Sequence, residues 1–245
     1  QDYLALGNET FQAAGARFVR STALAAIRDA NHMDRITAAS PREIEALLEQ
    51  AAHEYAHCDH LRFDVDPRTP PAFEAALRLD DGFEWSESLV MALEDELRGR
   101  AQPFEIRAVA DEVGWAELGR LHAANWAEGE RGADTNVGTA MLASMRRKSP
   151  RVRFWLGYAD GAARGYVASW EGTQGVGQVE SLFVHPDARH RGLATALLHH
   201  GVRDCRAHGA GPVALVADAA GTPKRMYTAM GWRALALKRE YLGKH

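Results

Sequence analysis

Residues 179–195 read VESLFVHPDARHRGLAT. The apolar residues 179–184 predict a strand, and a His-Pro turn and a basic loop with one glycine follow it. An apolar helix then begins after Gly192. A loop that opens a helix presents unpaired backbone N–H groups and the positive end of the helix dipole. This order of elements therefore predicts a phosphate-binding turn.

The side chains of this loop favour the same kind of ligand. Arg189, His190 and Arg191 supply positive charge, and Gly192 lets a ligand come close to the backbone. The spacing differs from the Gly-x-Gly-x-x-Gly turn of dinucleotide-binding proteins and from the Gly-Lys-Ser/Thr loop of nucleoside triphosphatases. Taken alone, the loop is more simply interpreted as a surface turn rich in arginine.

The segments after the loop help to decide between a phosphate-binding turn and a surface turn. Apolar residues at helical spacing predict a helix from the loop to His208, and residues 213–217 predict a short buried strand. Residues 222–232 read TPKRMYTAMGW, which predicts a helix with Pro in its first turn and Gly at its end. A last strand is expected over residues 233–238.

The sequence upstream predicts a strand over residues 104–109, two helices and a hairpin. The hairpin strands, 152–158 and 164–170, are joined by an Asp160-Gly161 turn. The strand that ends at Val184 would then be the third of three antiparallel strands.

Two of these motifs resemble one family. The pattern Arg-x-x-Gly-x-Ala, made by Arg189, Gly192 and Ala194, resembles the acyl-CoA pyrophosphate loop of the GNAT acetyltransferases. The helix end Tyr227-x-x-x-Gly-Trp is similar to the corresponding helix end in the same family. The order of the surrounding elements also matches the order in that family. The resemblance covers residues 104–245. It implies an α/β (α+β) fold with a mixed central sheet of the GNAT acyl-CoA N-acyltransferase type.

The first hundred residues carry a weaker version of the same plan: strand, Thr-Pro, helix, Gly-aromatic, strand. Here a helix starts at Ser40-Pro41 without a basic glycine loop, and Glu74 stands where Tyr227 stands in the later copy. We therefore predict a smaller, degenerate GNAT-like α/β unit without a cofactor loop in residues 1–102. The GNAT acetyltransferase domain would occupy residues 103–245. A coincidental β-α-β repeat is the alternative.

Composition agrees with a cytoplasmic protein. The chain of 245 residues is 46% hydrophobic with a formal net charge of −4, which gives no reason to expect nucleic acid as a partner. Cys58 and Cys205 suggest a reducing compartment rather than a disulfide framework. No apolar run approaches the roughly 20 residues that span a bilayer, so we expect no membrane association.

Residues 53–57, HEYAH, match the zincin pattern His-Glu-x-x-His. His53 and His57 are expected opposite the apolar stripe of their helix, and the helix is expected to end there. A solvated polar face is therefore the favoured interpretation, and we predict no functional metal.

The resemblance also implies an activity. The family moves an acetyl group from acetyl-CoA, the acyl donor, directly to a primary amine in a ternary complex. The strand at 182–184 would splay from the strand at 213–217 to admit the pantetheine arm, and backbone N–H groups would hold the pyrophosphate. The cofactor-binding candidates are Leu182, Phe183, Val184, Arg189, His190, Arg191, Gly192, Leu193, Ala194, Thr195 and Asp218.

Two catalytic candidates follow from the same resemblance. Glu180 is expected on the same strand face as Leu182, as the base that takes a proton from the amine. Its strand is also similar to that of small-molecule aminoglycoside acetyltransferases. Tyr227, which keeps its proton at neutral pH, would protonate the departing thiolate. Ala220 stands where the family often has Asn, and Asp218 is the candidate substitute.

The acceptor is the least defined partner. We expect a small-molecule amine. Three acidic residues in the loop between the first two helices of this domain would favour a cationic amine, unless the loop is simply solvated: Glu128, Glu130 and Asp134. Arg131 in the same loop opposes them. A peptide or protein amine, and a non-catalytic acyl-CoA-binding or interaction protein, remain as alternatives. The sequence leaves homodimerisation open.

Overall fold

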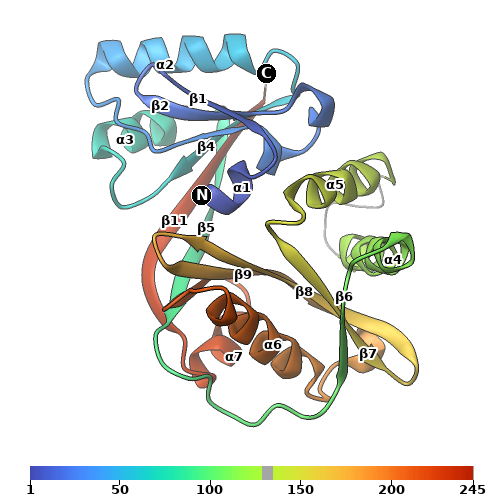
Figure 1. The fold of residues 1–245 in the computed structure, drawn as a ribbon. Helices are drawn as coiled ribbons and strands as arrows, with labels where there is room; N and C mark the ends of the chain where they lie inside the picture. Colours follow the sequence, from blue (N-terminus) through green and yellow to red (C-terminus); the bar gives the residue numbers. More distant parts are fainter. Residues whose placement is uncertain (129–134, 245) are drawn as a thin grey trace. The chain divides into compact units, whose positions relative to one another are not determined.

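The computed structural model describes residues 1–128 and 135–244 (Figure 1). These residues form two compact units. The first contains Gln1–Val90, Ala217–Gly221 and Leu235–His245, and the second contains Met91–Val216 and Thr222–Ala234. The division after Val90 differs from the predicted boundary between residues 102 and 103, and the end of the chain joins the first unit.

The first unit contains these elements: α1 (Asp2–Ala5), β1 (Glu9–Ala13), β2 (Ala16–Arg20), η1 (Thr22–Leu24), η2 (Arg28–Ala30), β3 (His32–Asp34), α2 (Pro41–Glu54), β4 (His60–Val65), α3 (Pro71–Leu79), most of β5 (Phe83–Leu93) and the end of β11 (Arg233–Lys244). Its strands follow the order β1-β2-β3-β4-β11-β5. The predicted helices and strands from Ser40 onwards are all present, whereas the elements before residue 40 lay outside the sequence prediction.

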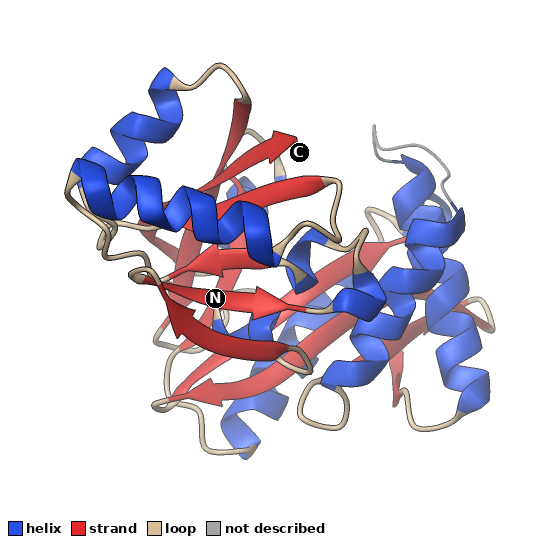
Figure 2. Cartoon of the chain, turned by 90° about the horizontal axis from the view of Figure 1, so that it is seen from above, coloured by secondary structure: helices blue, strands red, loops and turns tan. Residues whose placement is uncertain are grey.

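Helices α2 and α3 bury their apolar sides against this sheet (Figure 2). Leu47 and Ala51 of α2 and its C-cap residue Tyr55 are buried together with Phe63 of β4 and Phe73 of α3. The spacing of the α2 residues, four apart, places them on one side of the helix, as the sequence pattern predicted.

The last strand completes the first unit. β11 pairs antiparallel with β4, from Arg239↔Val65 to Lys244↔His60. Tyr241 is fully buried, and its hydroxyl donates a hydrogen bond of 2.8 Å to Glu74 of α3. Without β11 the backbone groups along this edge of β4 would lack partners, which explains why these residues pack with the first unit.

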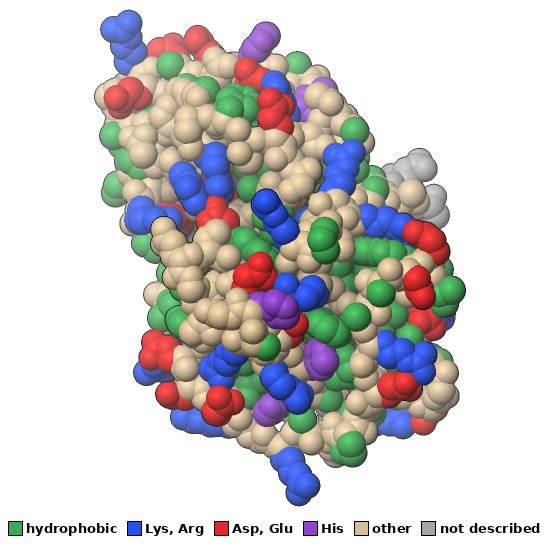
Figure 3. Space-filling view, viewed as in Figure 1, with side chains coloured by type: hydrophobic (Ala, Val, Ile, Leu, Met, Phe, Trp, Pro, Cys, Tyr) green, Lys and Arg blue, Asp and Glu red, His purple; other side chains and the backbone are tan. Residues whose placement is uncertain are grey.

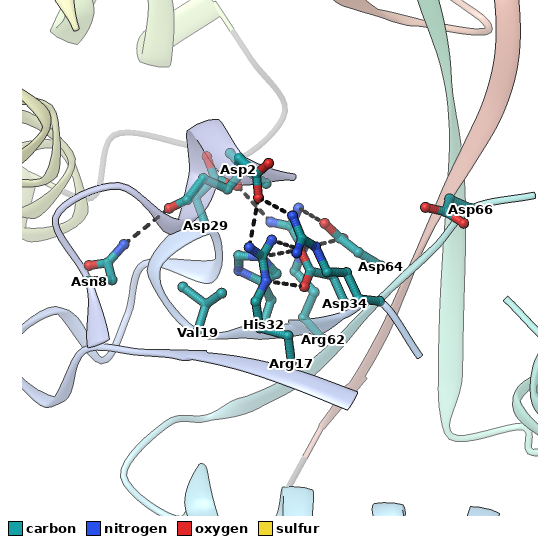
Figure 4. Close-up of polar contacts among 12 residues, drawn as sticks. Asp2, Asn8, Arg17, Val19, Asp29, His32, Asp34, Arg62, Asp64 and Asp66 are labelled. Carbon is teal, nitrogen blue, oxygen red and sulfur yellow. Dashed lines mark hydrogen bonds and ion pairs between the residues drawn. The ribbon is translucent and has the colours of Figure 1, made fainter. Parts of the chain in front are cut away.

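The face of this sheet opposite α2 carries buried charges (Figure 4). Arg17 is paired with Asp34 in the strand register, and its Nη2 lies 2.5 Å from the carboxylate. On the neighbouring strand Arg62 contacts Asp64, which also binds Lys238 at 2.6 Å. Pairing is required here, because an isolated buried charge is strongly unfavourable.

The residues of the zincin pattern lie at the end of α2. The helix stops at Glu54, so His57 lies outside it, and His53 is exposed on its surface. His57 Nε2 is 3.2 Å from the side-chain oxygen of Asn31. In the described part of the chain no three His, Cys, Asp or Glu side chains are grouped as metal ligands.

The second unit contains these elements: β6 (Glu105–Ala108), α4 (Glu112–Glu128), α5 (Thr135–Lys148), β7 (Arg153–Ala159), β8 (Ala162–Thr173), β9 (Val176–Val184), η3 (Pro186–Ala188), α6 (Leu193–Ala207), β10 (Val213–Asp218) up to Val216, and α7 (Pro223–Ala229). The strand order is β10-β9-β8-β7-β6. This mixed sheet and its element order confirm the predicted fold class.

Helices cover both faces of the second sheet (Figure 1). Leu193 and Leu197 of α6 are buried on one face against Val167 of β8. On the other face Trp115 of α4 packs on Phe154 of β7, with ring centroids 5.5 Å apart. Both faces of the central strands are therefore apolar at the helix contacts, which is typical of a buried sheet.

Charges of both signs alternate over the visible surface (Figure 3). Many belong to ion pairs, for example Arg146 with Glu112 at 2.7 Å. No helix in the described part of the chain combines the length and apolar character that a bilayer crossing needs.

Candidate functional site

The parallel strands β9 and β10 separate shortly after they meet. Their register contains the pairs Val213↔Gly177 and Ala214↔Gln178. Beyond these pairs β9 continues to Val184 and β10 to Asp218 without further register partners between them. The predicted splay is therefore present, and it exposes strand edges that an extended amide chain could pair with.

A β-bulge interrupts β9 beside this opening. Ala168 of β8 lies opposite Glu180 and Tyr166 lies opposite Phe183, so Ser181 and Leu182 together face one residue of β8. Ser181 has a φ of 57°, the left-handed conformation found in such bulges.

The bulge changes which residues share a face. Residues opposite each other in a sheet project to the same side, so Glu180 lies on the side of Phe183 and Tyr166. Leu182 packs instead with the residues beneath α6, among them Leu193. The expectation that Glu180 and Leu182 share a face is wrong, because it assumed an unbroken alternation of period two.

Glu180 and Tyr227 are brought together from β9 and α7. Burial, together with the smaller effect of the nearby negative charge of Glu180, raises the pKa of Tyr227 to about 12. Gln178 donates a hydrogen bond of 2.7 Å to Glu180 Oε1. The Tyr227 ring also packs edge-on against Trp232 at 6.4 Å. The pair thus combines a carboxylate with a phenol that stays protonated at neutral pH.

A buried polar network on the same sheet face was missed by the sequence analysis. The Tyr166 hydroxyl lies 3.2 Å from His122 Nδ1 and accepts a hydrogen bond of 3.1 Å from Asn125. Burial raises the pKa of Tyr166 to about 12 and lowers the pKa of His122. The network is therefore neutral at pH 7. In the sequence, this network was indicated only by the spacing of His122 and Asn125, which are three residues apart and so lie on the same side of one helix.

The backbone of the predicted phosphate loop is shaped for a ligand. His190 and Gly192 have φ values of 59° and 89°, and Gly192 is the N-cap of α6. Gly192 itself has no side chain that could cap this helix start. The first N–H groups of a 15-residue helix therefore point toward the loop without an intrahelical partner.

The arginines of the loop contact carboxylates. Arg189 donates to Glu128, with Nη2 2.5 Å from the carboxylate, and to the carbonyl of Val184 at 2.9 Å. Arg191 makes a bidentate pair with Asp160 at 2.6 and 2.9 Å. These ion pairs are exposed, so they contribute little stability and can exchange for a phosphate. Glu128, one of the acidic residues expected near the acceptor, is therefore paired with Arg189 of the loop.

The other cofactor candidates differ in what they can offer. Phe183 and Leu193 are buried side chains, and Leu193 can reach a ligand only through its backbone. Leu182 and Val184 are half-buried beside the α6 core, and Ala194 and Thr195 are half-buried in the first turn of α6. Asp218 belongs to the first unit and accepts a hydrogen bond from the backbone N–H of Ala220. Glu130, Arg131 and Asp134 lie outside the described residues.

Comparison with known proteins agrees with this architecture. Residues 115–232 match the family model described as "Acetyltransferase (GNAT) family". No curated protein matched the sequence.

Solved structures match nearly the whole chain. A GCN5-related N-acetyltransferase from Kribbella flavida is 16% identical with a TM-score of 0.70, covering 97% of this chain and 89% of its own. A functionally unknown conserved protein from Staphylococcus epidermidis is 15% identical with the same TM-score, covering 97% and 94%. A tandem GNAT protein from the clavulanic acid biosynthesis pathway is 14% identical with a TM-score of 0.57, covering 82% and 68%. At these identities the likeness concerns the fold.

Proposed function

From the match of residues 115–232 to the GNAT acetyltransferase family model, we propose that the protein transfers an acetyl group from acetyl-CoA to the primary amine of a small molecule. An acyl transferase needs a place for the phosphates of the donor, an opening for its thioester arm, and groups that move protons. The uncapped start of α6, the gap between β9 and β10, and the pair Glu180–Tyr227 supply these three.

The observation that carries this proposal is the proximity of Glu180 and Tyr227. They come from separate elements, yet the charge of Glu180 acts on the Tyr227 hydroxyl. In the proposed reaction the amine passes a proton to Glu180, directly or through water, and its lone pair attacks the thioester carbonyl. The C–N bond forms and the C–S bond breaks as the thiolate sulfur takes the proton of Tyr227. The nitrogen of the new amide then releases its second proton, which restores the Tyr227 hydroxyl, and Glu180 returns its proton to solvent.

Positioning supplies a further part of the rate. The N–H groups at the start of α6 and the arginines Arg189 and Arg191 would fix the pyrophosphate, and the strand edges would align the pantetheine amides. Holding the thioester and the amine together removes up to roughly 7–11 kcal/mol of the barrier in favourable cases.

The proposed acceptor is a small cationic amine. The carboxylate of Glu180 attracts an ammonium group, and the neutral network of His122, Tyr166 and Asn125 on the same sheet face offers polar atoms without a competing charge. His122 Nε2 is buried without a hydrogen-bond partner among the described residues. It is available to a polar group of the acceptor.

Tyr227→Phe tests the acid role. In the presence of an amine that the protein acetylates, we expect kcat to fall at least about tenfold while the Kd for acetyl-CoA stays unchanged. Tyr158→Phe is the matched control, because Tyr158 lies on another strand of the same unit, β7, and donates its hydroxyl hydrogen to Glu117 of α4.

Unchanged turnover in Tyr227→Phe would remove this residue from the mechanism. A protein that binds acetyl-CoA but acetylates none of a broad amine panel would instead be a non-catalytic acyl-CoA-binding protein, the alternative that Ala220 raises.

A further inference from the structure

A groove of about 790 Å³ lies between α6 and the segment that precedes and begins β6. Arg100, Gln102 and Phe104 line one wall, and Ala196, His200 and Arg203 line the other. The whole groove belongs to the second unit. None of these residues belongs to the predicted phosphate loop, so the groove is a separate feature of the molecule.

The wall formed by the segment is held in place before the groove begins. Arg206 of α6 binds the side chain of Glu96 at 2.7 Å and the carbonyl oxygen of Asp95 at 2.6 Å. The backbone N–H of Arg98 donates to the carbonyl of Met230 at 2.9 Å, at the end of α7. These contacts fix the course of the chain just before Arg100, so the groove is preorganised rather than formed by a loose strand.

The charge of the groove is positive and unbalanced. Among the described residues, neither Arg100 nor Arg203 has an ion-pair partner, whereas Arg206, one turn further along α6, is paired with Glu96. The described lining residues include no Asp or Glu. The third basic side chain, His200, packs edge-on against Trp155 at 4.2 Å. Two arginines that converge on one groove without a carboxylate suit a phosphate monoester.

The groove adjoins the start of α6. The side chain of Gln102 lies within 3.5 Å of the position that a Gly192 Cβ would take. Positions 192, 196, 200 and 203 follow one stripe of the helix, so His200 lies about 12 Å along the axis from Gly192. A ligand anchored by its pyrophosphate at the start of α6 can therefore extend into the groove, and arginine side chains on a helix lean back toward that end.

We propose that this groove binds the nucleotide end of acyl-CoA, with Arg100 and Arg203 holding its ribose 3′-phosphate. The apolar wall of Pro103, Phe104 and Ile106 supports the purine. The inference rests on the proposed function, because it assumes that acyl-CoA is the ligand. The proposal gives the segment between β5 and β6 a direct part in donor recognition.

The test compares acetyl-CoA with acetyl-3′-dephospho-CoA by calorimetry on the full chain. The wild type should bind acetyl-CoA at least about tenfold more tightly. In the double variant Arg100→Ala, Arg203→Ala the two ligands should bind within about twofold of each other, with the affinity for the dephospho ligand unchanged. That unchanged affinity also shows that the variant is folded.

Arg151→Ala is the matched control. Arg151 is another exposed arginine of the second unit without an ion pair among the described residues. It precedes β7 and is not among the residues that line the groove. This variant should discriminate between the two ligands as the wild type does.

Three results would overturn the inference. Equal binding of both ligands by the wild type, or undiminished discrimination in the double variant, would remove the 3′-phosphate from the groove while leaving acyl-CoA binding intact. Adenosine 3′,5′-bisphosphate that binds without displacing acetyl-CoA would show that the groove takes a separate phosphorylated ligand. If the wild type binds neither thioester, the proposed function itself fails.

Discussion

At the scale of single residues, the ionisation of Asp34 makes the stability of the first unit depend on pH. Its side chain is fully buried, and burial alone would raise its pKa. Hydrogen bonds from Arg17, with a contribution from His32 at 3.8 Å, outweigh burial and lower the pKa of Asp34 to about 2 (Figure 4). Because the folded-state pKa lies below the ordinary value, the stabilisation is complete above about pH 4 and is lost as the pH falls toward 2. A shift of this size corresponds to about 2 kcal/mol.

Asp34→Asn should therefore lower the free energy of unfolding by about 3 kcal/mol at pH 7, since it removes the buried carboxylate of Arg17 and leaves it only the more exposed Asp2 as an anion. It should also flatten the loss of stability between pH 4 and pH 2. Urea unfolding at several pH values measures both effects. Glu9→Gln is the control, because Glu9 is exposed and pairs with Arg20 at the surface, so it should cost less than about 1 kcal/mol. Equal effects of the two substitutions would contradict the role of the buried pair.

At the scale of elements, the starts of α2 and α6 differ in a way that decides which can bind phosphate. Ser40 and Glu43 form a capping box at α2, in which each side chain bonds to the backbone of the other. The helix start is thereby satisfied and carries a negative charge. At α6 the N-cap is Gly192, without a side-chain cap. An anion is expected at α6 and excluded at α2.

Gly192→Glu should abolish acetyl-CoA binding, because it places a carboxylate and a strained backbone at the phosphate position. Gly209→Glu is a matched control: Gly209 has a φ of 91° and open space around it, at the other end of the same helix. Calorimetry with acetyl-CoA should show binding in the control alone, with circular dichroism confirming that both variants are folded. Retained binding in Gly192→Glu would exclude the loop as the pyrophosphate site.

The sequence predicted the elements better than their irregularities. Periodicity identified the helices and strands from Ser40 onwards, and the splay of β9 from β10 followed from the family resemblance. The bulge at Ser181 could not be foreseen, because a serine with positive φ leaves no mark on a pattern of apolar residues. It moves Glu180 to the face of Tyr166, where the network with His122 lies.

At the scale of the whole molecule, we propose that the first unit is a shortened copy of the second without donor binding. In both units a helix joins two parallel strands, β3 to β4 and β9 to β10. Glu74, which aligns with Tyr227, binds Tyr241 and Arg239 instead of offering an acid. The predicted boundary at residue 102 missed the packing of β11 with β4, because strand pairing across a long sequence separation leaves no local signal.

The central claim is that the uncapped start of α6 binds the phosphates of an acyl-CoA donor. Calorimetric titration of the full chain with acetyl-CoA and with acetyl-pantetheine, which carries the same thioester without the nucleotide, tests it most directly. Our account predicts binding of acetyl-CoA with a Kd of about micromolar order and no measurable binding of acetyl-pantetheine. Failure to bind acetyl-CoA, or equal affinity for the two thioesters, would contradict it.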